Sequence, residues 1–67
     1  PSMADYTNKG PSYTLTYQDA VEIWRRHWSG EYQHRIAAHF DVNSGRVNEV
    51  LKRRKFLGSE QSARQQA

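Results

Sequence analysis

The chain contains no cysteine. Disulfide bonds therefore cannot hold the fold together, and a zinc site built from thiolates is excluded. The sequence also has no apolar run close to the ~20 residues that a membrane-spanning helix needs, and no charged-then-apolar secretory leader. We therefore expect a cytoplasmic protein that does not bind membranes, with a core held by side-chain packing alone.

Motifs of catalysis are missing as well. The sequence has no GxSxG nucleophile motif, no phosphate-binding loop and no paired-carboxylate site. Of its three histidines, His34 and His39 are five residues apart, which is off the i, i+4 spacing that places two metal ligands on one helix face. We expect these histidines at the surface, His39 near a phosphate, and we expect no enzyme, no metal and no cofactor.

The charge of the chain is distributed unevenly. Its 67 residues allow one small domain, with a net charge of +3. Residues 1–24 carry one lysine against three acidic residues, whereas residues 42–67 carry six lysines and arginines against two glutamates. This basic C-terminal part favours a polyanionic partner, nucleic acid first. A solvated basic face explains the charge equally well, so the charge alone does not decide.

Both ends of the chain have the composition of flexible segments. Residues 1–13 contain both prolines and no apolar period, and Pro1 and Ser2 ahead of Met3 look like the remnant of a cleaved tag. Residues 58–67 are mostly Ser, Gln, Glu, Arg and Ala. We therefore predict a flexible N-terminal segment over 1–13, one domain over 14–57 and a flexible C-terminal tail over 58–67.

The first predicted helix covers residues 17–28. Thr16 is a suitable N-cap, Asp19 completes an approximate capping box, and Gly30 is a suitable stop just past the C-terminus. At helical spacing, one apolar stripe is expected to face the core, formed by Tyr17, Ala20, Val21, Trp24 and Trp28.

Two shorter helices are predicted to follow. One covers residues 32–40, with Ile36, Ala37 and Phe40 as its buried edge, and the turn 41–43 separates it from the next. Asn43 is a strong N-cap for a helix from 44 to about 54. The core side of that helix is expected to comprise Val47, Val50, Leu51 and the stem of Arg54, with Phe56 and Leu57 folding back near Lys55. The fold class is therefore all-α, a compact three-helix domain.

Residues 33–52, QHRIAAHFDVNSGRVNEVLK, resemble the helix-turn-helix DNA-binding family. The buried and small positions of that pattern are filled by Ile36, Ala37, Phe40, Val42, Val47 and Val50. The turn position that is usually glycine is Asp41, one of the few residues that tolerate a positive φ. With the helix in front, residues 14–56 are similar to the three-helix domains of bacterial and phage repressors, recombinases and homeodomains.

The resemblance implies that the helix from residue 44 reads the major groove. Its base-reading residues would be Ser44, Gly45, Arg46, Asn48 and Glu49, with Arg46 suited to guanine and Asn48 to adenine. Glu49 sits four residues before Arg53 and could instead only brace that arginine. Contacts with phosphates would come from Gln33, Asn43, Lys52, Arg53, Arg54 and Lys55.

We therefore expect sequence-specific binding of double-stranded DNA by a small bacterial or phage-type transcriptional regulator. A single module this small buries too little surface for strong specificity, so we expect a homodimer with Trp28, Phe56, Leu57 or the tail as contacts. Two other hypotheses stay open. One is a protein-interaction adaptor on the same scaffold, and the other is an architectural protein that binds duplex DNA without sequence choice.

Overall fold

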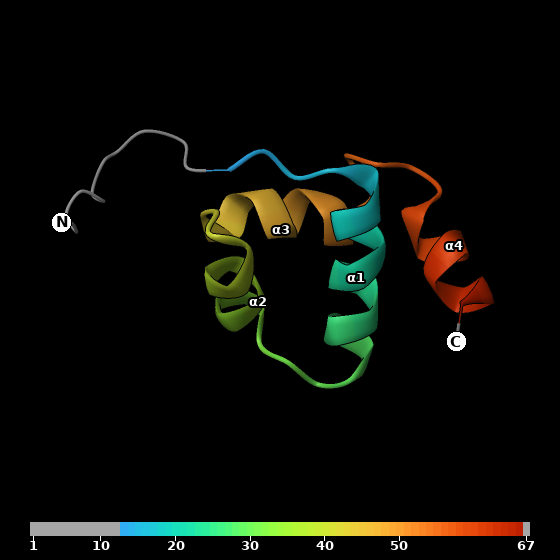
Figure 1. Ribbon diagram of the computed structural model, residues 1–67, viewed down its shortest axis with the longest axis horizontal. Helices are drawn as coiled ribbons and strands as arrows, with labels where there is room; N and C mark the ends of the chain where they lie inside the picture. Colours follow the sequence, from blue (N-terminus) through green and yellow to red (C-terminus); the bar gives the residue numbers. More distant parts are fainter. Residues whose placement is uncertain (1–12, 67) are drawn as a thin grey trace, which may run out of the picture.

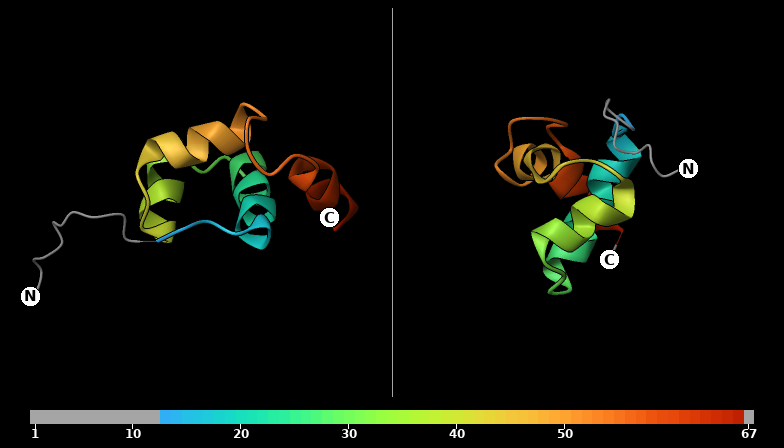
Figure 2. Two further views of the ribbon diagram at one scale, coloured as in Figure 1. Left: turned by 90° about the horizontal axis from the view of Figure 1, so that it is seen from above. Right: turned by 90° about the vertical axis from the view of Figure 1, so that its left-hand side faces the viewer.

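The computed structural model describes residues 13–66, so the N-terminal segment predicted over 1–13 lies, except for Tyr13, outside the described residues. Within the described part the chain is all-helical, with helices α1 (Tyr17–Trp28), α2 (Gln33–Phe40), α3 (Ser44–Leu51) and α4 (Ser59–Gln65). Helix α3 crosses the ends of α1 and α2, and α1 lies between α2 and α4 (Figures 1 and 2). The all-α class is confirmed, but the described residues form four helices and not three.

Helix α1 begins and ends as the sequence predicts. The Thr16 side chain accepts a hydrogen bond from the Asp19 backbone N–H at 3.1 Å, and the Asp19 carboxylate accepts one from the Thr16 N–H at 3.0 Å. This capping box satisfies two N–H groups that the first turn of a helix otherwise leaves free. The Tyr13 hydroxyl also donates to Asp19, at 2.7 Å. Local capping chemistry therefore fixes where the helical part of the fold starts.

Three of the helices end in the same way, with a residue in the left-handed conformation just past the helix. Those residues are Gly30 with a φ of 98°, Asp41 with 58° and Arg53 with 60°. After α2, the Asp41 N–H donates to Ala38 and the Val42 N–H donates to Ala37, which is the pair of bonds of a Schellman motif. Asp41 therefore has the positive φ that the sequence predicts, without glycine.

We expect Asp41→Gly to stabilise the protein by up to about 1 kcal/mol, because glycine adopts a positive φ without the steric cost that a side chain adds. Urea unfolding followed by circular dichroism measures this change. The matched control is Gly30→Ala, which should destabilise: no atom lies within 4 Å of the added Cβ, so only backbone strain acts. An Asp41→Gly variant less stable than the parent would show that the carboxylate has a stabilising role of its own.

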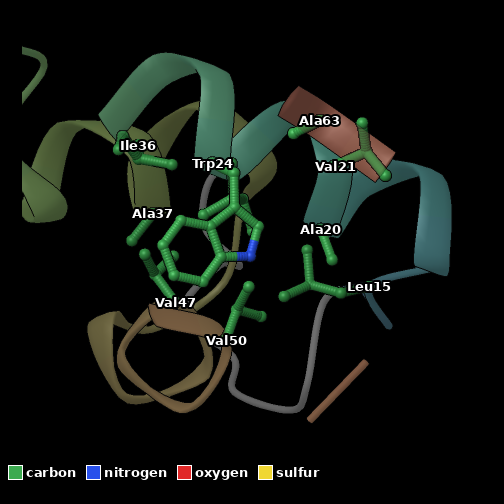
Figure 3. Packing of buried hydrophobic residues seen from close by; sticks show 10 residues of the cluster. Leu15, Ala20, Val21, Trp24, Ile36, Ala37, Val47, Val50 and Ala63 are labelled. Carbon is green, nitrogen blue, oxygen red and sulfur yellow. The ribbon is translucent and has the colours of Figure 1, made fainter. Parts of the chain in front are cut away.

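The core lies where α1, α2 and α3 meet, and the Trp24 ring of α1 points toward Val47 and Val50 of α3 (Figure 3). The buried hydrophobic residues are Leu15, Ala20, Val21, Ile23, Trp24, Ile36, Ala37, Val47, Val50 and Ala63. Phe40 and Leu51 pack against this cluster but are only partly buried. The predicted core residues are therefore correct for the centres of α1, α2 and α3.

The ends of the predicted core stripe on α1 are wrong. Tyr17 is 43 % exposed and Trp28 is 41 % exposed, whereas Ile23, which the stripe omits, is fully buried. Ile23 is buried because α1 packs against α2 and α3 as well as against α4, and contact with several helices buries a wider arc of its surface than one stripe.

Residues 59–65, predicted as part of a flexible tail, form helix α4 on the surface of α1. Ala63 of α4 is fully buried, and the buried Ser59 side chain accepts a hydrogen bond from the Trp24 indole N–H at 3.1 Å. The Tyr17 hydroxyl and the Ser62 hydroxyl are 2.8 Å apart and hydrogen-bonded. A polar segment therefore folds here because small residues and hydroxyl groups fit against α1.

Helix α3 ends earlier than predicted, at Leu51 instead of near residue 54. The Arg54 stem, expected beside the core, is exposed, and so is Leu57, at 74 %. Phe56 folds back against the core in part, with a left-handed φ of 55°. The break after Leu51 turns the following chain toward α4, where Glu60 binds Arg53.

Candidate functional site

The candidate site is built on α2, the turn 41–43 and α3. Ile36 and Ala37 of α2 and Val47 of α3 are buried at the contact between the two helices. The Asn43 side chain caps α3 by accepting a bond from the Arg46 backbone N–H at 3.3 Å, so Asn43 has the N-cap role that its residue type predicts. The turn therefore holds α3 in a fixed position relative to α2.

The N-terminal half of α3 presents most of the predicted reading residues to solvent. Ser44, Gly45 and Arg46 are exposed, and Asn48 and Glu49 are half-buried. The Arg46 guanidinium donates to the Glu49 carboxylate at 2.9 Å. Glu49 thus braces Arg46, one turn before it, and not Arg53 as the i, i+4 spacing suggests.

The structure explains why residue 45 is a glycine, which its position in the first turn of the helix did not indicate. A Cβ at this position would lie 3.0 Å from the Asn43 Oδ1, the atom that caps the helix. A side chain here would push that oxygen away from the Arg46 N–H. Gly45 therefore allows the cap to form, whether or not a ligand approaches the backbone.

Gln33, a predicted phosphate contact, ties the start of α2 to the start of α3. Its side-chain amide N–H donates to the Ser44 backbone carbonyl at 3.3 Å. Beside it, Tyr32 is 70 % exposed and its ring stacks on His34. The N-termini of both helices therefore lie close together on one side of the fold.

Residues 52–55, here called the basic segment, follow α3 and are all exposed. Their backbone leaves the helix, so they do not extend the reading face as a helical continuation would. Arg53 is already engaged: its guanidinium donates to both carboxylate oxygens of Glu60 at 2.7 and 3.0 Å and lies 5.5 Å from the Trp24 ring centre. The structure thus assigns Arg53 to holding α4 and leaves Lys52, Arg54 and Lys55 at the surface.

Lowering the pH should loosen α4. The hydrogen bond from Arg53 holds the pKa of the Glu60 carboxyl below its usual value, although some desolvation opposes this, and Arg64 adds to the lowering at 3.1 Å. A carboxyl with a lowered folded-state pKa stabilises the fold above its unfolded pKa and loses this contribution as the pH falls through the folded value. We therefore expect α4 to detach from α1 more readily as the pH falls through the lowered pKa of the Glu60 carboxyl.

Tryptophan fluorescence measures this detachment, because Ser59 and Arg53 both contact Trp24. The matched control is Glu60→Gln, whose side chain does not titrate and should remove the acid transition assigned to α4. A fluorescence transition of equal size and midpoint in both proteins would contradict the assignment.

Arg26 contacts three other side chains near the ends of α1 and α2. Its pair with Glu22, at 3.0 Å, follows from i, i+4 spacing, but it also donates to Glu31 at 3.0 and 3.3 Å and contacts the His39 Nε2 at 3.0 Å. His39, which we expect near a phosphate, accepts a hydrogen bond from Arg26, because a guanidinium has donors only. Arg26 therefore joins the end of α1 to the end of α2.

Two shallow hollows lie beside the basic segment. One, of about 220 Å³, is bordered by Leu15, Arg46, Lys55 and Phe56, and the other, of about 280 Å³, lies between Trp24, Phe56 and α4.

Residues 13–66 contain no cluster of three or more His, Asp or Glu side chains arranged to hold a metal ion. None of the helices α1 to α4 is both long and apolar enough to cross a bilayer.

Comparison with known proteins does not test the resemblance to the helix-turn-helix family. The chain matches no protein-family model, no curated protein and no solved structure.

Proposed function

We propose that this protein binds double-stranded DNA in a sequence-specific manner, with α2 and α3 as a helix-turn-helix and α3 in the major groove. The observation that carries the proposal is the exposed start of α3, where Ser44, Gly45 and Arg46 face solvent next to the exposed basic segment. One surface thus offers side chains that pair with base edges and cations that neutralise phosphates.

The proposed roles follow from chemistry and position. Arg46 donates to guanine and Asn48 pairs with adenine, while Glu49 orients Arg46 through their salt bridge. Lys52, Arg54 and Lys55 contact phosphates, and Gln33 adds a contact at the start of α2. Arg53 is no longer among the proposed phosphate contacts because Glu60 binds it. Such a protein would regulate transcription by occupying an operator, as a homodimer on a two-fold site.

A second candidate is an architectural protein that coats duplex DNA. The Arg46–Glu49 salt bridge favours it, because it neutralises the charge of the main predicted base-reading side chain. The cations of the basic segment would then supply most of the affinity, which is independent of sequence.

Selection from a pool of random duplexes, followed by sequencing, tests the proposal. We expect enrichment of one palindromic sequence. Binding without enrichment would contradict sequence reading and support the architectural protein. If no duplex binds even at low salt, where phosphate contacts are strongest, DNA binding itself is wrong and a protein-interaction adaptor takes its place.

A further inference from the structure

The interface between α4 and the rest of the fold is made with a single helix. Among the described helices, α4 packs against α1 only. Its contacts with α1 include the buried Ala63, the Trp24–Ser59 hydrogen bond at 3.1 Å and the Tyr17–Ser62 hydrogen bond at 2.8 Å. Arg64 lies over the Trp28 ring, and Glu60 binds Arg53, which follows α3. The contacts of α1 with α2 and of α1 with α3 therefore do not involve α4.

The chain that connects α3 to α4 is short and strained. Between Arg53, which closes the end of α3, and Ser59, which starts α4, lie only residues 54–58. Phe56 in this linker has a φ of 55°, a conformation that a bulky L-residue rarely adopts. This residue lies in the bend that places α4 on the α1 of the same chain. An extended linker would not contain this bend and would span ~17 Å.

We propose that α4 is exchanged between two copies of this chain, so that each copy docks its α4 on the α1 of the other. The occupant of the α1 surface is then the same helix, and every contact described above is reproduced. The exchanged form also removes the reverse bend at Phe56, and short linkers under strain favour such exchange. This dimer rests on the geometry of α4 and does not depend on DNA binding.

One salt bridge changes from intramolecular to intermolecular in the exchanged dimer. Arg53 stays at the end of α3, where its guanidinium lies 5.5 Å from the Trp24 ring centre, whereas Glu60 moves with α4. Arg53 of one copy therefore binds Glu60 of the other, through the same bidentate hydrogen bonds of 2.7 and 3.0 Å. The exchange therefore has a testable charge signature, because the Arg53–Glu60 pair then joins two copies.

The first test uses this signature in size-exclusion chromatography with light scattering. We expect the parent protein to form, as its concentration rises, a dimer of twice its 7.8 kDa. Arg53→Glu alone and Glu60→Arg alone place like charges together in the monomer and in the exchanged homodimer alike. In a heterodimer of the two variants each exchanged pair is opposite in charge again, so their mixture should form dimers to a greater extent than either variant alone. The double variant Arg53→Glu/Glu60→Arg should form homodimers to the extent of the parent. A parent that is monomeric at every concentration, or a mixture that stays monomeric while the parent dimerises, would overturn the exchange.

The second test does not alter the salt bridge. The chain has no cysteine of its own, so Tyr17→Cys and Ser62→Cys each introduce a single thiol at the α1–α4 contact. When the two single variants are mixed and treated with a short bismaleimide, exchange predicts covalent heterodimers on denaturing gels. In the double variant, the ratio of cross-links between chains to cross-links within one chain measures how often α4 docks on the α1 of the other copy. Cross-linking confined to single chains of the double variant, with no heterodimer from the mixture, would contradict the proposal.

Discussion

Trp24→Ala is expected to lower the free energy of unfolding by about 3–5 kcal/mol, as large-to-small substitutions of buried aromatic residues do. Trp24 is only 4 % exposed, and its ring fills the space between α1 and α3. The substitution also removes the indole N–H that binds Ser59, which leaves a buried hydroxyl without this donor. A domain of this length has a free energy of unfolding of ~3–10 kcal/mol, so the variant should be largely unfolded or close to it.

Thermal unfolding followed by far-ultraviolet circular dichroism measures the effect. The matched control is Trp28→Ala, on the same helix but 41 % exposed, where Arg64 lies over the ring at 4.9 Å. We expect this control to lose much less stability. If both variants melt at the same temperature, the ring of Trp24 does not fill the core as described.

Arg46→Ala is expected to weaken binding of the selected duplex by about 1–3 kcal/mol and to relax selectivity at one base pair. Arg46 is exposed and lies outside the core, so the fold should be unaffected. The loss should be specific to the selected sequence because a bidentate bond to a base edge is absent on the wrong base. Fluorescence anisotropy titrations against the selected and a scrambled duplex, at several salt concentrations, measure both quantities.

Lys52→Ala is the matched control for this experiment. Lys52 is exposed at the C-terminal end of α3 and is assigned to a phosphate. Its removal should weaken all duplexes alike and reduce the slope of log affinity against log salt by about one unit per protomer. Equal losses on both duplexes for Arg46→Ala would show that Arg46 touches only the backbone and would favour the architectural protein.

The sequence predicts those parts of the fold that depend on neighbouring residues. The start of α1 follows from the reciprocal bonds of Thr16 and Asp19, and the start of α3 follows from Asn43 as N-cap. The positive φ of Asp41 was predictable for the same reason, since few other residues tolerate that conformation at a turn. Each of these signals acts over three or four residues.

Helix α4 could not be predicted because its stability depends on residues far away in the chain. Its sequence, SEQSARQ, contains a single apolar residue, Ala63, and shows no apolar face. It is held by Trp24 and Tyr17 through bonds that span 35 and 45 residues. The one sequence signal was Glu60, which lies four residues before Arg64 and seven after Arg53.

The candidate site was predictable in position but not in its side-chain pairing. Arg46 and Asn48 lie on α3 where the pattern puts them, at the predicted start of the helix. The prediction that Glu49 could brace Arg53 was wrong because α3 ends at Leu51. Arg53 therefore lies beyond the helix, where it binds Glu60. Where a helix ends thus decides which of two arginines a glutamate can reach.

The cap of α3 divides the exposed surface of this helix into replaceable and fixed positions. A Cβ at Gly45 would displace Asn43 from the Arg46 N–H, so residues 43 and 45 are fixed by the helix itself. Ser44 and Arg46 contribute no side chain to the core, and Arg46 is coupled only to Glu49. A library that randomises residues 44, 46, 48 and 49 would therefore sample new binding preferences while leaving the cap in place, whereas substitutions at residue 45 would weaken the cap and destabilise the fold by about 1 kcal/mol.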